Sequence, residues 1–337
     1  MQRWNDLGDV PHDLAGSVVA IGNFDGVHRG HRAVLNRLAS IARERGCVSV
    51  AITFDPHPVR VLRPHEAPVP LTTLEHRLDL MARTGLDAAL VIPFTLELAA
   101  WSPERFVDDV LVDRLHADVV VVGRDIRFGH RNSGDLATMR ELGRDRGFEV
   151  LVIDDVGDEA VGPGQDDAEH TTLRWSSTWL RGVIAEGDVE SATRVLGRPH
   201  RVTGTVVHGD HRGRELGYPT ANLGPDAVGA VPADGVYAGW LELLDLPHGG
   251  QDDAGEGGTQ RRLPAAVSVG TNPTFDGKDR RVEAYVLDRD DLDLYGRRVG
   301  VEFVSRLRPT LRFDGVEALL ETMADDVRRC REILRDS

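Results

Sequence analysis

The chain has 337 residues, of which 41% are hydrophobic and 28% are charged, as in ordinary globular proteins. Its formal net charge of -15 argues against a nucleic-acid-binding protein, which needs a basic face. The sequence contains no run of about 18 apolar residues, so we expect no membrane span.

The cysteines, the N-terminus and the single lysine indicate the cellular compartment and the groups that can bind phosphate. Cys47 and Cys330 lie far apart in no metal-binding spacing, which indicates free thiols in a reducing cytoplasm. The polar N-terminus lacks the apolar core of a signal peptide, which agrees with a cytoplasmic location. Because Lys278 is the only lysine, arginines or a metal ion must neutralise any bound phosphate.

Residues 1–199 alternate between strand-like and helix-like segments. Short apolar runs occur at 18–21, 48–54, 88–94, 119–122 and 150–153. Amphipathic stretches occur between them, at 31–46, 72–85 and 102–116. This alternation predicts an α/β domain with a doubly wound parallel sheet.

From about residue 201 the pattern changes to short runs rich in Val and Tyr, separated by Gly, Pro and Asp. These runs occupy 201–209, 235–244, 264–271, 281–288 and 297–309. They predict a small antiparallel β-barrel, followed by an amphipathic helix over 316–334. We therefore expect two domains, 1–199 and 200–337.

The segment GNFDGVHRGH, residues 22–31, joins a predicted strand to a predicted helix. Gly22 and Gly26 allow a ligand to approach the backbone closely, and the start of a helix attracts phosphate. His28 and His31 lie near that start, where imidazole N–H groups can stabilise charge on a phosphoryl group. A metal-binding pair or two surface histidines are the alternatives, but the glycine context favours phosphate.

This segment resembles the G-x-F-D-x-x-H-x-G-H signature of the nucleotidylyltransferase superfamily. Together with ITFDPHP at 52–58, VVGRDIRFG at 121–129 and the stretch at 173–199, it resembles the N-terminal module of bifunctional prokaryotic FAD synthetases. Members of that family carry FMN adenylyltransferase and riboflavin kinase on one chain. Taken alone, the Ser-Ser-Thr stretch at 176–178 is more typical of an ordinary helix N-cap, but its place after a fifth predicted α/β strand favours a functional role.

The resemblance implies that His28 and His31 are catalytic residues of adenylylation. It implies that ATP is bound in this module by Gly22, Phe24, Asp25, Asp125, Arg174, Ser177, Thr178 and Arg181.

The stretch GTVVHGDHRGRELGYPTANL, residues 204–223, carries the chemistry of the second half. Its glycines suit a loop that covers a phosphate, and the Thr and Asn of Pro-Thr-Ala-Asn offer hard oxygen ligands for Mg²⁺. A plain Pro-Thr turn is the alternative. The stretch resembles the riboflavin kinase module, whose Pro-Thr-Ala-Asn motif holds Mg·ATP. The resemblance implies metal binding by Thr220 and Asn222, and ATP binding by Gly204, Gly209, Gly213, Thr220 and Asn222.

Glu283 lies in an otherwise apolar run, VEAYVL. A charge in that position commonly marks the solvent face of a half-buried strand. The resemblance assigns Glu283 the role of general base, which takes the proton from the 5′-hydroxyl of riboflavin as that oxygen attacks the γ-phosphate.

Two positions depart from the family pattern. Asp125 stands where the family usually shows Asn, and Thr310 stands where an acidic residue is common. The first bears on ATP binding in the adenylyltransferase module, and the second on flavin contacts in the kinase module.

The resemblance implies an enzyme that phosphorylates riboflavin to FMN and then adenylylates FMN to FAD, with ATP as co-substrate and Mg²⁺ as cofactor. One alternative is a riboflavin kinase whose adenylyltransferase domain is impaired, to which Asp125 points. Another is a flavin-binding protein without catalysis. We expect riboflavin, FMN, FAD and ATP as partners, with no nucleic acid and no membrane. Whether the chain forms a homo-oligomer stays open.

Overall fold

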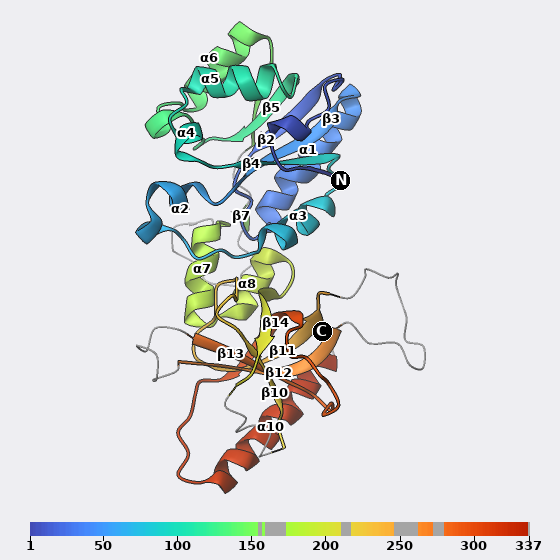
Figure 1. Ribbon diagram of the computed structural model, residues 1–337, viewed down its shortest axis with the longest axis vertical. Helices are drawn as coiled ribbons and strands as arrows, with labels where there is room; N and C mark the ends of the chain where they lie inside the picture. Colours follow the sequence, from blue (N-terminus) through green and yellow to red (C-terminus); the bar gives the residue numbers. More distant parts are fainter. Residues whose placement is uncertain (154–156, 159–172, 210–216, 246–261, 272–279, 336–337) are drawn as a thin grey trace, which may run out of the picture. The chain divides into compact units, whose positions relative to one another are not determined.

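The computed structural model describes the chain except residues 154–156, 159–172, 210–216, 246–261, 272–279 and 336–337 (Figure 1). The chain divides into two compact units. The first spans residues 1–68 and 74–176, and the second spans residues 69–73 and 177–337.

The first unit contains a six-stranded sheet in the order β1-β4-β3-β2-β5-β6, in which every neighbouring pair is parallel. The strands are β1 (Gln2–Trp4), β2 (Ser17–Ile21), β3 (Val48–Asp55), β4 (Ala88–Pro93), β5 (Ala117–Gly123) and β6 (Glu149–Ile153). The five apolar runs expected to be strands are β2 to β6. This confirms the predicted doubly wound parallel sheet, to which the structure adds the short edge strand β1.

Helices cover both faces of this sheet (Figure 1). One face packs against α1 (Arg29–Arg45) and α3 (Leu74–Ala82), through residues such as Leu38 and Met81. The other face packs against α5 (Pro103–Phe106), the π-helical turn at Val107–Val112 and α6 (Leu136–Arg146). The short helices α2 (Pro58–Leu62) and α4 (Leu96–Ala99) lie in connections. Burial on both faces explains why the central strands are continuously apolar.

The strand order places a topological switch point beside β2. The chain moves from β2 to β3 and β4 on one side, and β5 pairs with β2 on the other side. The loops that follow β2 and β5 therefore meet at the carboxyl edge of the sheet. In open α/β sheets, ligands bind at this crevice.

The second unit is built on a closed antiparallel barrel in the order β10-β13-β12-β11-β14-β9. Its strands are β9 (His200–Val207), β10 (Thr220–Leu223), β11 (Gly235–Leu243), β12 (Arg262–Thr271), β13 (Arg280–Val286) and β14 (Arg298–Arg308). Val267, Ala284 and Phe303 belong to the fully buried barrel core. Helix α10 (Val316–Arg335) packs on β11 and β12, with Cys330 in that contact. The predicted barrel and C-terminal helix are confirmed.

Two further helices, α7 (Ser177–Glu186) and α8 (Val189–Leu196), group with the barrel. Val189 is fully buried in the barrel core, and the Glu190 carboxylate accepts hydrogen bonds from Ser305 Oγ at 2.7 Å and from the backbone N–H of Arg306 at 3.0 Å. The second compact unit includes α7 and α8 and so takes in residues from 177 onward. The domain boundary near residue 199 stays a prediction.

The remaining strands, β7 (Gly157–Asp158) and β8 (Leu173–Arg174), pair with each other in antiparallel fashion. Within the described ranges, none of the helices is both long and apolar enough to cross a membrane.

Candidate active sites

The first candidate site is the loop that joins β2 to α1. The Gly22 N–H donates to the carbonyl of Ile52 at 3.1 Å, which ties the loop to β3. The Phe24 ring lies over Gly22 so closely that a Cβ there would come within 3.0 Å of the ring. Phe24 and Asp25 are buried, with exposed fractions of 4% and 6%. The signature residues therefore build a closely packed loop, in which residue 22 has room for glycine but not for a larger residue.

The two histidines lie side by side at the start of α1. His28 is the N-cap, and its Nδ1 accepts the backbone N–H of His31 at 3.3 Å. The two rings stack with centroids 3.7 Å apart, and the Phe24 ring meets the His31 ring edge-on at 5.4 Å. The sequence placed both imidazoles near this helix start, and the structure brings them into direct contact.

This packing bears on the tautomer of His28 and on the protonation of His31. Because Nδ1 of His28 accepts a hydrogen bond, the ring hydrogen of neutral His28 lies on Nε2. Burial lowers the pKa of His31 well below its usual value, and the neighbouring His28 lowers it further. His31 is therefore neutral at pH 7. A neutral imidazole still carries one N–H, which can donate to a phosphate oxygen.

The other predicted ATP-site residues of this module lie on three elements. Asp125 is exposed in the turn that follows β5, and this turn lies at the same sheet edge as the histidine loop. Ser177, Thr178 and Arg181 lie in the first turns of α7, which belongs to the second unit. The Nε atom of Arg181 donates to the carbonyl of Val69 at 2.6 Å. Arg174 lies in β8. Their shared role in ATP binding stays a prediction.

The second candidate site lies on two neighbouring strands of the barrel. Asn222 on β10 is paired directly opposite Glu283 on β13, and Thr220 is opposite Tyr285. Residues opposite each other in an antiparallel pair point to the same face, with Cβ atoms about 5 Å apart. Pairing therefore joins the Pro-Thr-Ala-Asn motif and the predicted base, which lie in separate parts of the sequence.

Two cavities meet at these strands and share Thr220. One is lined by Gly209, Thr220, Asn222 and Tyr295. The other is lined by Thr220, Glu283 and Tyr285 together with residues of α10. The site therefore has two binding spaces, with a hydroxyl at their border and a carboxylate in the second space.

The Pro-Thr-Ala-Asn residues have the donor chemistry of a magnesium site. The Asn222 Nδ2 atom lies 3.3 Å from the Thr220 hydroxyl oxygen, so the two side chains converge on one place. A Cβ at Gly209 would come within 2.6 Å of the Asn222 side chain. Gly209 thus lets the chain pass directly over this cradle. A hydroxyl and an amide oxygen are hard donors that suit Mg²⁺.

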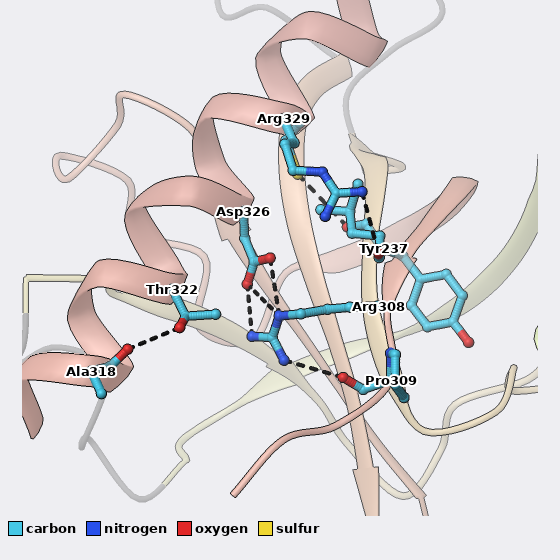
Figure 2. A network of polar contacts seen from close by, with 9 residues as sticks. Tyr237, Arg308, Pro309, Ala318, Thr322, Asp326 and Arg329 are labelled. Atoms are coloured by element: carbon cyan, nitrogen blue, oxygen red, sulfur yellow. Dashed lines mark hydrogen bonds and ion pairs between the residues drawn. The ribbon is translucent and has the colours of Figure 1, made fainter. Parts of the chain in front are cut away.

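The second cavity is closed on one side by α10, which an ion pair holds to the end of β14. Figure 2 shows Arg308 reaching Asp326 on α10, where its Nη2 and Nε atoms donate to the carboxylate at 2.7 and 3.0 Å. The Nη1 atom donates to the Pro309 carbonyl at 3.2 Å, and Arg329 donates to the Leu307 carbonyl at 3.2 Å. These contacts fix the helix that forms the cavity wall.

Comparison with known proteins covers both units. Residues 10–162 match the family model for FAD synthetase, and residues 196–334 match the model for riboflavin kinase. A protein of Listeria monocytogenes called bifunctional riboflavin kinase/FMN adenylyltransferase is 35% identical over 326 residues, which cover 96% of this chain and 92% of the relative. The chain belongs to the bifunctional riboflavin kinase/FMN adenylyltransferase family.

Further relatives agree along the full length. The protein of the same name from Escherichia coli K12 is 34% identical over 328 residues, covering 97% of this chain and 95% of the relative. A crystal structure described as a macrolide-efflux protein from Streptococcus pneumoniae superimposes with a TM-score of 0.79 and 28% identity, covering 98% of each chain. Membership in the bifunctional family confirms the resemblance inferred from the motifs.

The glycines predicted to cover a phosphate in the kinase module have different placements. Gly204 does not lie in a loop: it is buried inside β9, where a Cβ would come within 3.2 Å of the Ala227 Cα atom. The expectation failed because a glycine in a strand that packs closely on a neighbouring backbone looks, in sequence, like a loop glycine. Gly209 follows β9 and lines the first cavity. Gly213 lies outside the described residues.

Two arginines at these sites escaped the sequence reasoning. Arg308 ends β14, and Arg77 lies in the middle of α3 with its side chain only 8% exposed. The spacing of Arg77 could have revealed it. Arg77 follows Leu74 by three residues and precedes Met81 by four, which places a charge on the apolar face of a helix.

Proposed function

We propose that this chain makes FAD from riboflavin in two steps at two separate sites. The barrel unit transfers the γ-phosphoryl group of ATP to riboflavin and gives FMN and ADP. The first unit transfers the AMP part of a second ATP to FMN and gives FAD and pyrophosphate. The observation that carries this proposal is that the histidine loop and the Pro-Thr-Ala-Asn site lie on separate folded modules, each matched by its own family model.

In the kinase step, ATP occupies the cavity lined by Gly209, Thr220 and Asn222, and riboflavin occupies the cavity beside α10. The Glu283 carboxylate accepts the proton of the riboflavin 5′-hydroxyl. That oxygen forms a bond to the γ-phosphorus, and the bond from the γ-phosphorus to the β,γ-bridging oxygen breaks. The shared position of Thr220 between the two cavities supports this arrangement, because the hydroxyl and the phosphoryl group must meet there.

In the adenylyl step, a phosphate oxygen of FMN attacks the α-phosphorus of ATP, and pyrophosphate leaves. No protein nucleophile is needed, since positioning and charge stabilisation supply the rate. The Nε2–H of His28 and the ring N–H of His31 donate to phosphate oxygens as charge develops. The backbone N–H groups and dipole at the start of α1 favour the same charge.

The supporting components of this proposal are Mg²⁺ and a cytoplasmic setting. Thr220 and Asn222 would hold Mg²⁺, which when bound to ATP neutralises part of the phosphate charge. Cys47 and Cys330 are free thiols, and burial raises the pKa of Cys330 to about 12, so that thiol is unreactive. Free thiols suit a reducing compartment. We propose no nucleic acid or membrane partner.

Substitutions at the two sites test the role assignments on one chain. We expect Glu283→Gln to stop FMN formation from riboflavin, because an amide cannot take the proton, while FAD formation from supplied FMN continues. We expect His28→Ala to lower FAD formation by about 10²-fold, the scale of losing one charge-stabilising donor, while FMN formation continues. Chromatography of the flavins separates the two readouts. Equal loss of both activities in either variant would overturn the assignment.

A further inference from the structure

The histidine loop has a backbone conformation that L-amino acids rarely adopt. Phe24, Gly26 and Val27 have φ values of 47°, 81° and 38°. A positive φ is especially unfavourable for Val27, because its side chain is β-branched. Phe24 and Val27 are also buried. Such a conformation persists only where surrounding contacts hold it in place.

Arg77 supplies a further contact that joins this loop to the carboxyl end of β3. Its Nη1 atom donates to the carbonyl of Asn23 at 2.8 Å, and the Thr53 hydroxyl donates to the same carbonyl at 3.1 Å. The Nη2 atom of Arg77 lies 3.5 Å from the carbonyl of Phe54 and 3.6 Å from a carboxylate oxygen of Asp55. One planar guanidinium therefore spans the histidine loop and the carboxyl end of β3.

The charge of Arg77 is buried and interacts with two carboxylates. Burial lowers its pKa, while Asp25 and Asp55 oppose that shift. The Asp55 partner is half exposed and lies at a long distance, and the Nε atom of Arg77 makes no hydrogen bond within the described residues. Replacing a buried charge by a well-packed apolar side chain is often neutral or stabilising, so a charge kept at this position favours a role beyond packing.

We propose that Arg77 is a positioning residue for adenylyl transfer: it fixes the histidine loop through the Asn23 carbonyl and places a buried positive charge beneath the phosphates of ATP. Arg77 acts through the loop and touches no reacting atom. The inference rests on the proposed adenylyltransferase activity and adds to it a residue outside the signature motifs.

The test uses the full-length protein with Arg77→Lys and Arg77→Met, and with Arg114→Lys as the matched control. Arg114 lies in the same unit and also donates to backbone carbonyls, those of Gly8 and Val10 at 3.0 and 2.7 Å. Each variant is assayed for FAD formation from FMN across an ATP titration, for FMN formation from riboflavin, and for thermal unfolding.

Arg77→Lys keeps the charge but cannot span two carbonyls, so kcat for FAD formation falls about 10-fold while KM for ATP changes less than about 3-fold. Arg77→Met removes both contributions, so kcat falls about 10²-fold and KM rises, on the scale expected for misplaced catalytic groups. FMN formation stays within about 2-fold in all variants, and Arg114→Lys leaves both activities unchanged.

Unchanged FAD formation in the Arg77 variants would overturn the inference, as would parallel loss of both activities or an equal loss in Arg114→Lys. If Arg77→Met does not fold, Arg77→Lys decides, and an unfolded Lys variant also contradicts a positioning role. If the unmodified protein forms no FAD, the proposed function itself has failed, which this design separates from a failure of Arg77.

Discussion

Replacing Gly209 by alanine tests whether the packing over Asn222 sets kinase activity. A Cβ at residue 209 would lie 2.6 Å from Asn222 Nδ2 and 2.7 Å from its Cγ, so the Asn222 side chain must move. Its two hydrogen bonds to Thr220, both 3.3 Å long, are then lost. At about 1 kcal/mol for each bond, the change is about 2 kcal/mol, which corresponds to a roughly 30-fold lower kcat/KM.

The assay measures FMN formation from riboflavin across an ATP titration, with FAD formation from supplied FMN as the internal control. Gly270→Ala is the matched variant, because Gly270 lies on the same barrel and no atom of the described residues lies within 4 Å of an added Cβ. We expect the loss only for Gly209→Ala and only in FMN formation. A kcat/KM for FMN formation equal to that of the unmodified protein would refute the reasoning from packing.

Three further predictions concern other parts of the chain. Asp125→Asn removes a negative charge at the switch point. Two charges about 4 Å apart in water interact by about 1 kcal/mol, so KM for ATP in FAD formation should fall roughly 5-fold. An unchanged or higher KM rules out a direct contact between Asp125 and the triphosphate. The fragment 177–337 should form FMN. Its free energy of unfolding in urea should be at least about 3 kcal/mol above that of fragment 200–337, because α8 buries Val189 and its Glu190 accepts hydrogen bonds from β14. Equal free energies of unfolding would show that α8 does not stabilise the barrel. His31 has a lowered pKa in the folded state, so its contribution to stability is present above about pH 6.5 and is lost as the pH falls below that value. Between about pH 7.5 and about pH 5.5, the free energy of unfolding of the unmodified protein should therefore fall by up to about 1.4 kcal/mol more than that of His31→Gln. Identical decreases in the two proteins would contradict this.

Local patterns were sufficient to predict most of the elements. The apolar runs of the first half became β2 to β6 because strands covered on both faces need continuous apolar sequence. The Val-rich runs of the second half became barrel strands, and the amphipathic stretch at 316–334 became α10. The edge strand β1 escaped because it has three residues and pairs with β4, far along the chain.

The arrangement of the site residues depends on contacts that sequence periodicity does not encode. The pairing of Asn222 with Glu283 follows from the register of β10 and β13. The contact of Arg77 with Asn23 joins residues 54 positions apart. The grouping of α8 with the barrel depends on Val189 filling the barrel core. Motifs thus indicated which residues matter, while strand register and tertiary packing decide which of them meet.

The most direct test of two activities on one chain is a time course with purified full-length protein, riboflavin, ATP and Mg²⁺, in which the flavins and pyrophosphate are separated and quantified. We predict that FMN appears first and is then converted to FAD, with one pyrophosphate released for each FAD formed. Accumulation of FMN without FAD would contradict an active adenylyltransferase unit, and recovery of unchanged riboflavin would contradict catalysis altogether.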